Sequence, residues 1–144
     1  MTQDHLETAV SLRRAGYSCG QSVLIPYAKE FGLDEQLASA MALPLAGGMA
    51  KGRACGCLSG ACLVIGLKIG HGFPADPLPR KKTAAAVRAL TAQLEEHYGC
   101  TDCYALLGCD TSTPEGHAHF VEQNLREKIC IPVMELCIRF LDAL

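Results

Sequence analysis

The sequence predicts a single all-α domain spanning residues 1–144, a bundle of about five to seven helices with a glycine-rich loop before a buried central helix. No stretch alternates apolar and polar residues convincingly with the period of two that a half-buried strand shows, whereas apolar residues recur at helical spacing. Glycine, proline and capping residues divide the chain into segments of helical length. The chain is 49% hydrophobic without tryptophan, so aliphatic residues and alanine must supply the core.

Three helices are expected before the glycine-rich loop, over residues 4–17, 19–31 and 34–43. Ser18 and Asp34 stand where the second and third helices need an N-cap, and Gly32 follows the second as a C-cap. In the third helix we expect Leu37 and Met41 to face the core beside Ala38.

The central helix is expected over residues 55–69, after a flexible glycine-rich loop over residues 46–52. This helix is apolar nearly all round, which is typical of a buried helix. Gly60 and Gly66 each cost about 1 kcal/mol relative to alanine in a helix interior. Close packing by a neighbouring helix is the simplest compensation for that cost.

The second half of the chain is expected to hold a loop, a long helix, a short helical turn and a final helix, over residues 70–79, 80–98, 100–108 and 113–144. Gly99 ends the long helix. Thr113 is a candidate N-cap followed by Pro114 at the first helical position. The final helix is expected to bend near Pro132.

Charge and hydropathy exclude two classes of partner. The formal charge is −2, and the single cationic run, Arg80-Lys81-Lys82, is typical of a solvated helix start, so no nucleic acid is expected. The longest apolar run, residues 61–67, is far shorter than the roughly 20 residues that span a bilayer, so no membrane insertion is expected. The N-terminal residues lack the pattern of a signal peptide, which favours a cytoplasmic location.

Nine cysteines in such a chain are unusual. In a reducing compartment they are not expected to form structural disulfides, and an odd number cannot pair completely within one chain. The cysteine content therefore favours metal binding or redox chemistry.

Three cysteines fall at expected helix starts, namely Cys19, Cys55 and Cys103. The exposed N–H groups and the dipole of a helix N-terminus favour a thiolate there, and they also favour a thiolate bound to a metal. Packing alone does not readily explain three such placements. Cys130 differs, because it lies late in a helix and two residues before Pro132.

The other cysteines are interpreted separately. Cys57 could pair with or assist Cys55, and Cys100 forms a C-x-x-C motif with Cys103, a spacing shared by metal sites and dithiol redox sites. Packing in the core is the favoured interpretation of Cys62 and Cys137, and Cys109 is a loop thiol without an assigned role. His117 and His119 are favoured as a solvated pair, because residues two apart do not share a helix face.

Four motifs extend over nearly the whole chain: Cys19 in Y-S-C-G-Q-S-V, Cys55-Gly56-Cys57-Leu58-Ser59-Gly60 leading to Gly66-Leu67-Lys68-Ile69-Gly70, Cys103 before Leu106-Leu107-Gly108, and Cys130 before Val133. With them the sequence resembles the C_GCAxxG_C_C family of small bacterial and archaeal redox proteins. The resemblance selects Cys19, Cys55, Cys103 and Cys130 as the site residues. Cys57 departs from the family, which usually has alanine there.

The resemblance extends to the helical iron–sulfur portion of split-Soret cytochromes and implies a cofactor. The expected function is redox chemistry with a 2Fe-2S or 4Fe-4S iron–sulfur cluster held by the four thiolates, for electron transfer or redox sensing with an unidentified partner protein. Zinc or a single iron ion on the same thiolates is an alternative. A thiol–disulfide oxidoreductase using Cys55/Cys57 or Cys100/Cys103 without a metal is another, and a helical binding or scaffold protein a third. Enzymatic activity and a homodimer are left open.

Overall fold

The computed structural model describes residues 4–144, and within that range the protein is all-α, as predicted. These residues form eight α-helices rather than five to seven, because the final segment divides into α7 and α8. The helices are α1 (His5–Arg14), α2 (Cys19–Ala28), α3 (Glu35–Ala42), α4 (Gly56–Ile69), α5 (Leu78–Tyr98), α6 (Cys103–Leu107), α7 (Pro114–Glu122) and α8 (Ile131–Ala143). Two 3₁₀ turns (Lys29–Phe31, Leu43–Leu45), a π-helical turn (Arg126–Cys130) and a turn over Gly48–Gly52 complete them.

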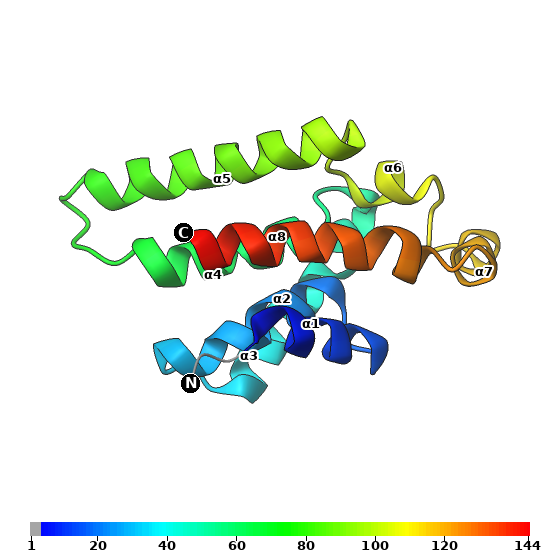
Figure 1. Ribbon diagram of the computed structural model, residues 1–144, viewed down its shortest axis with the longest axis horizontal. Coiled ribbons are helices and arrows are strands. Elements are labelled where there is room, and N and C mark those ends of the chain that lie inside the picture. Colours follow the sequence, from blue (N-terminus) through cyan, green and yellow to red (C-terminus); the bar gives the residue numbers. More distant parts are fainter. Residues whose placement is uncertain (1–3) are drawn as a thin grey trace.

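The helices form three layers (Figure 1). The middle layer holds α4 and α8, which pack side by side. The long α5 covers one side of this layer, and α1, α2 and α3 cover the other. The short α6 and α7 lie together at one end of the bundle, beyond the C-terminal end of α5. The centre of the core is therefore α4, which contacts both outer layers.

The expected caps account for the helix boundaries. The side chain of Ser18 accepts a hydrogen bond from the N–H of Gln21, whose amide oxygen in turn accepts from the N–H of Ser18 at 2.9 Å, forming a capping box. Asp34 and Thr113 also cap the helices that follow them. Gly32 adopts the left-handed conformation that ends the 3₁₀ turn after α2.

The packing of α4 against α2 confirms one prediction for its glycines and contradicts the other. A Cβ atom on Gly60 would lie 2.9 Å from the carbonyl oxygen of Gly20, so the two backbones meet where neither residue has a side chain. A Cβ atom on Gly66 would meet no atom within 4 Å, so no close neighbour explains that glycine.

Two further expectations from the sequence are wrong. Leu37 and Met41 are 54% and 49% exposed, because the short α3 contacts α2 and buries only Ala38 and Ala42. The final segment turns at Asn124, where φ is 53°, rather than at Pro132. Pro132 lies in the first turn of α8, a position that needs no N–H donor and tolerates proline.

The glycine-rich segment before α4 forms an ordered left-handed turn rather than a flexible loop. Gly47, Gly48, Met49 and Ala50 have φ values of 64°, 64°, 58° and 61°. A Cβ atom on Gly48 would lie 2.5 Å from the backbone of Arg53, so only glycine fits there. The turn therefore sets the approach of the chain to the N-terminus of α4.

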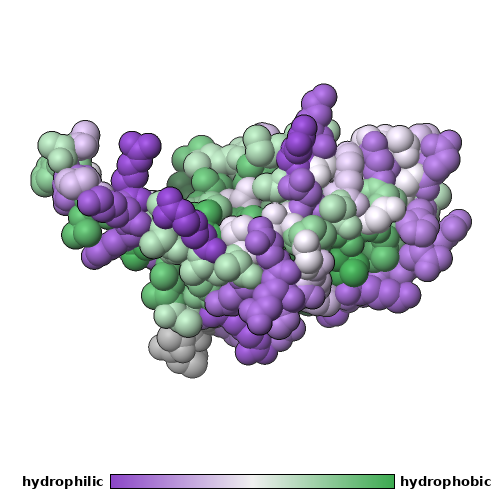
Figure 2. Space-filling model, turned by 90° about the horizontal axis from the view of Figure 1, so that it is seen from above, coloured by the Kyte–Doolittle hydropathy of each residue, from purple (hydrophilic) through white to green (hydrophobic). Residues whose placement is uncertain are grey.

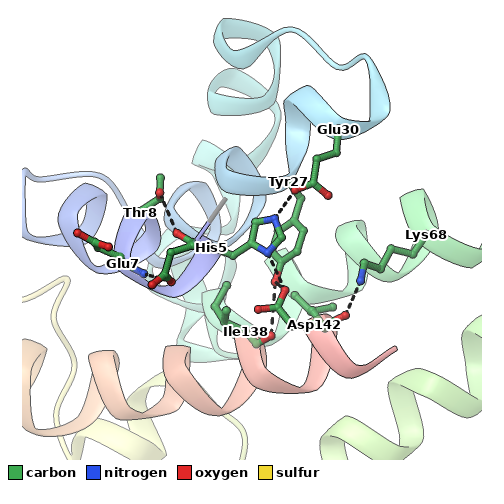
Figure 3. A network of polar contacts seen from close by, with 10 residues as sticks. His5, Glu7, Thr8, Tyr27, Glu30, Lys68, Ile138 and Asp142 are labelled. Atoms are coloured by element: carbon green, nitrogen blue, oxygen red, sulfur yellow. Dashed lines mark hydrogen bonds and ion pairs between the residues drawn. The ribbon is translucent and has the colours of Figure 1, made fainter. Parts of the chain in front are cut away.

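A polar network joins α1, α2 and α8 at the end of the bundle away from α6 and α7 (Figure 3). The ring of His5 stacks on Tyr27 with centroids 3.9 Å apart, and its nitrogens contact Glu30 and Asp142. The buried hydroxyl of Tyr27 donates to Asp142 Oδ1 at 2.7 Å. Lys68 of α4 donates to the Leu141 carbonyl at 2.6 Å. The network thus links the first helix to the last.

Polar and apolar side chains are interspersed on the face seen from the α5 side (Figure 2). Among residues 4–144, no helix combines the length and apolarity needed to cross a membrane.

Candidate functional site

Four cysteines meet where α2 and α4 begin and the turn before α8 ends. Cys19 is the first residue of α2, Cys55 is the N-cap of α4, Cys57 lies in the first turn of α4, and Cys130 ends the π-helical turn before α8. The Cys19 thiol is in hydrogen-bond contact with the thiols of Cys57 and Cys130, and Cys57 also contacts Cys55. All nine cysteines are free of disulfides. Residues far apart in sequence thus form one cluster of thiols.

The close pairing of α2 and α4 brings the first of these cysteines together. A Cβ atom on Gly56 would lie 3.1 Å from the Cβ atom of Cys19, so the glycine allows Cys19 to reach the start of α4. From the other side, Cys57 Sγ donates to the backbone carbonyl of Cys130 at 3.8 Å. The small residues at the α2–α4 contact therefore help to determine where the thiols lie.

Cys103 reaches the cluster through a short backbone bridge. The N–H of Cys103 donates to the carbonyl of Arg53 at 2.7 Å, and the N–H of Cys55 donates to the carbonyl of Thr101 at 2.8 Å. These two bonds hold the start of α6 beside the N-cap of α4. The structure thus brings together all four cysteines that the family resemblance selects. Cys57 is a fifth member of the same cluster.

The electrostatics favour a thiolate on Cys19. Hydrogen bonds from the Cys130 and Cys57 thiols lower the pKa of Cys19 well below its ordinary value. Burial opposes this shift, and the adjacent positive charge of Arg13 adds to it. The first position of α2 also favours negative charge. Cys19 therefore ionises more readily than an ordinary cysteine.

Cys57, Cys103 and Cys130 stay protonated beside it. Hydrogen bonds to Cys19 and Cys55 raise the pKa of Cys57, and the hydrogen bond to Cys19 followed by burial raises the pKa of Cys130. Burial, with the charges of Cys55 and Cys19 as smaller causes, raises the pKa of Cys103 to about 12. A second or third thiolate thus requires additional positive charge at the cluster.

A cavity of about 310 Å³ opens onto the cluster and gives it a route to solvent. Cys19, Cys103 and Cys130 line it, together with Arg13 and residues of the glycine-rich segment and α7. Cys55 and Cys57 are 6% and 0% exposed and lie behind these residues. The cluster therefore has an accessible side and a side sealed by the core.

The other cysteines lie apart from these contacts. Cys137 is fully buried in the core, and burial raises its pKa; Cys62 packs against the core and is partly exposed, and burial raises its pKa as well. Cys100 donates to the Tyr98 carbonyl at 3.7 Å, and no hydrogen bond to another cysteine is found for it within residues 4–144. Cys109 lies close enough to Cys103 to be a minor cause, after burial, of the raised pKa of Cys103.

Sequence reasoning missed Arg13, which contacts Cys19 and borders the cavity. Its signal in the sequence was weak, because a basic residue near the end of a helix normally interacts with solvent and the helix dipole.

Within residues 4–144, no three His, Cys, Asp or Glu side chains are already grouped as a metal ion would require. The donor set nevertheless fits a thiolate-ligated metal centre in type and number, because four thiols from four separate segments lie near one another. Loss of their protons and movement of the side chains would accompany metal binding.

Fold and site together define a small all-α protein in which thiols from separate helices converge beside a solvent-connected cavity. The chain belongs to the C_GCAxxG_C_C family, whose description is "Putative redox-active protein (C_GCAxxG_C_C)" and whose sequence profile matches residues 17–144. No curated protein and no solved structure matches the chain.

Proposed function

We propose that this protein is a redox protein that holds an iron–sulfur cluster through Cys19, Cys55, Cys103 and Cys130, for electron transfer or redox sensing with a partner protein. The observation that carries the proposal is the convergence of these four cysteines, from four segments of the chain, at one cavity: Cys19, Cys103 and Cys130 line it, and Cys55 lies behind them. Membership of a redox-active family supports it.

The cluster would supply one-electron chemistry, and the chain's own residues would hold and shield it. Cys103 and Cys130 must lose protons that burial and the neighbouring thiols now keep in place, and the cationic iron would compensate the resulting charge. The Cys57 thiol donates to the backbone carbonyl of Cys130 and contacts the Cys19 thiol, so it would help to orient the Cys19 sulfur. The core behind Cys55 keeps water from one side of the site.

Zinc or a single iron ion on the same thiolates is the close variant. The second candidate function is thiol–disulfide exchange, and the contact between the Cys55 and Cys57 thiols favours that pair as its dithiol. The Cys100/Cys103 pair receives less support, because Cys100 donates to a backbone carbonyl.

The test is anaerobic purification followed by a visible spectrum and assays of iron, zinc and acid-labile sulfide. Charge-transfer bands with stoichiometric iron and sulfide are expected. A colourless, metal-free protein that cycles two thiols against a dithiol donor would contradict the cluster and favour the exchange reaction. Zinc without iron would favour a zinc ion on the same thiolates.

Serine variants assign the ligands in the same assay. Cys19→Ser, Cys55→Ser, Cys103→Ser and Cys130→Ser should each lose bound iron. Cys62→Ser is the matched control and should retain it, because Cys62 packs on the core away from the cluster. Equal iron in all five variants would refute the assignment.

A further inference from the structure

A second cavity, of about 280 Å³, adjoins the cavity at the thiol cluster. The second cavity is lined by Arg13, His117, Phe120, Val121, Asn124 and Arg126. It shares Arg13, His117 and Phe120 with the thiol cavity, so the two spaces meet across these three side chains. Together they reach the size of a small-molecule binding site, which typically measures about 300–1,000 Å³.

Two guanidinium groups face the two cavities, and the thiolate there, Cys19, is already in contact with one of them, that of Arg13. The lining of the cavities includes the guanidinium groups of Arg13 and Arg126 and the imidazole of His117, and it includes no carboxylate among the described residues. The carboxylate that pairs with Arg126 belongs to Glu127, at 4.0 Å, and Glu127 is held by Arg14 through two hydrogen bonds of 3.0 Å. The surroundings therefore favour an anion.

Arg13 is one of the three side chains that the two cavities share, and not all of its hydrogen-bond donors have partners within the protein. Its Nη1 donates to the Tyr17 carbonyl at 3.3 Å, and the guanidinium contacts the Cys19 sulfur. Its Nε is buried and has no hydrogen-bond partner among residues 4–144. An arginine normally presents five donors, so a guanidinium beside an open cavity retains capacity for an acceptor.

We propose that the joined cavities bind a small molecule that carries a carboxylate or phosphate group. Arg13 provides the principal contact, and Arg126 and His117 contribute from the second cavity. A planar guanidinium recognises both kinds of oxyanion through paired N–H donors. The site goes beyond the proposed function, because it needs no metal centre. It would place an anionic reactant at the mouth of the cavity that Cys19 borders.

Isothermal titration calorimetry on the protein as purified provides the test, with inorganic phosphate, succinate and the uncharged succinamide as probes. Saturable binding of phosphate or succinate is expected, and succinamide should not bind. Phosphate alone would identify a phosphate group as the ligand chemistry, and succinate alone a carboxylate. Absence of saturable binding by both anions, or equal binding of succinamide, would overturn the proposal.

Three variants locate the site. Arg13→Gln should weaken anion binding at least tenfold, and Arg126→Gln should weaken it severalfold without touching any cysteine. Arg88→Gln is the control, because Arg88 is exposed on α5 and lines neither cavity. Unchanged affinity in both Arg13→Gln and Arg126→Gln would overturn the site.

Iron content measured on the same samples separates this proposal from the proposed function. Arg126→Gln should keep the iron content of the wild-type protein while losing anion affinity. Anion binding by a metal-free protein would uphold the anion site although the iron–sulfur cluster had failed. Bound iron in a protein that binds neither anion would overturn the anion site and leave the iron–sulfur cluster standing.

Discussion

Gly60 of α4 lies against Gly20 of α2 so closely that a Cβ atom at position 60 would stand 2.9 Å from the Gly20 carbonyl oxygen. Cys19 immediately precedes Gly20, and Cys57 lies one turn before Gly60. The spacing of these two helices therefore also determines the distance between two of the clustered thiols.

Gly60→Ala should destabilise the protein, because the added methyl group meets backbone that cannot rotate away. The expected loss is about 1–3 kcal/mol in the free energy of unfolding, the usual cost of overpacking. Gly66→Ala is the control within the same helix, since a Cβ atom there meets no atom within 4 Å. It should stabilise the helix by up to about 1 kcal/mol. Denaturant unfolding followed by circular dichroism measures both, and equal effects would contradict the packing.

The left-handed turn before α4 predicts a stabilising change. Met49 and Ala50 have φ values of 58° and 61°, which cost a residue with a side chain about 1–2 kcal/mol each. Met49→Gly and Ala50→Gly should therefore raise the free energy of unfolding by about 0.5–1 kcal/mol, after the greater freedom of glycine in the unfolded chain is subtracted. Ala46→Gly is the control, because φ at Ala46 is −58° and glycine gives no relief there. Destabilisation by all three would contradict a strained turn.

Tyr27 predicts a loss of stability at alkaline pH. Burial, followed by the hydrogen bond to Asp142, raises the pKa of Tyr27 far above its usual value. The unfolded chain releases the phenolic proton near pH 10, whereas the folded protein keeps it. The free energy of unfolding should thus be unaffected by this group below pH 10 and fall by up to about 1.4 kcal/mol per pH unit above it.

Tyr27→Phe isolates that contribution. The variant loses the hydrogen bond to Asp142 and should be less stable at neutral pH, by about 1 kcal/mol. Above pH 10 its stability should decline less steeply than that of the wild-type protein. Parallel pH profiles for the two proteins, measured by denaturant unfolding, would show that another group causes the alkaline loss.

Cys57 tests whether the cluster of thiols is larger than the four-cysteine set. Alanine is usual at this position in the family, so Cys57→Ala should keep the wild-type iron content if the other four cysteines are the ligands. Its stability should fall by about 1 kcal/mol, because a fully buried side chain and its bond to the Cys130 carbonyl are lost. Iron analysis and unfolding on the same sample give both values, and loss of iron would make Cys57 a ligand.

The helical fold could be predicted because local signals agree with it. Ser18, Asp34 and Thr113 cap helices as their side chains suggest, and the all-apolar α4 is buried. The exposure of Leu37 could not be predicted, because the periodicity of α3 does not reveal that this helix buries only Ala38 and Ala42. Likewise, glycines in sequence indicate conformational freedom, but the left-handed turn depends on contact with Arg53.

The sequence predicted which cysteines belong to the candidate site better than it predicted how they are arranged. Positions at helix starts indicated Cys19, Cys55 and Cys103, and the family motif added Cys130. The inclusion of Cys57 and the contact with Arg13 depend on how α1, α4 and α8 pack, which spacing along the chain does not encode.

Cys57 and Cys130 are 73 residues apart in sequence, and their contact closes only when the final segment docks on α4. Contacts between such distant segments form after local helices during folding. In a partly folded chain, Cys19, Cys55 and Cys57 would be close together while Cys130 still lacked its contact with Cys57. If the site binds the proposed cofactor, binding is expected to follow folding of the chain, and the cavity beside Cys19, Cys103 and Cys130 would be its entrance.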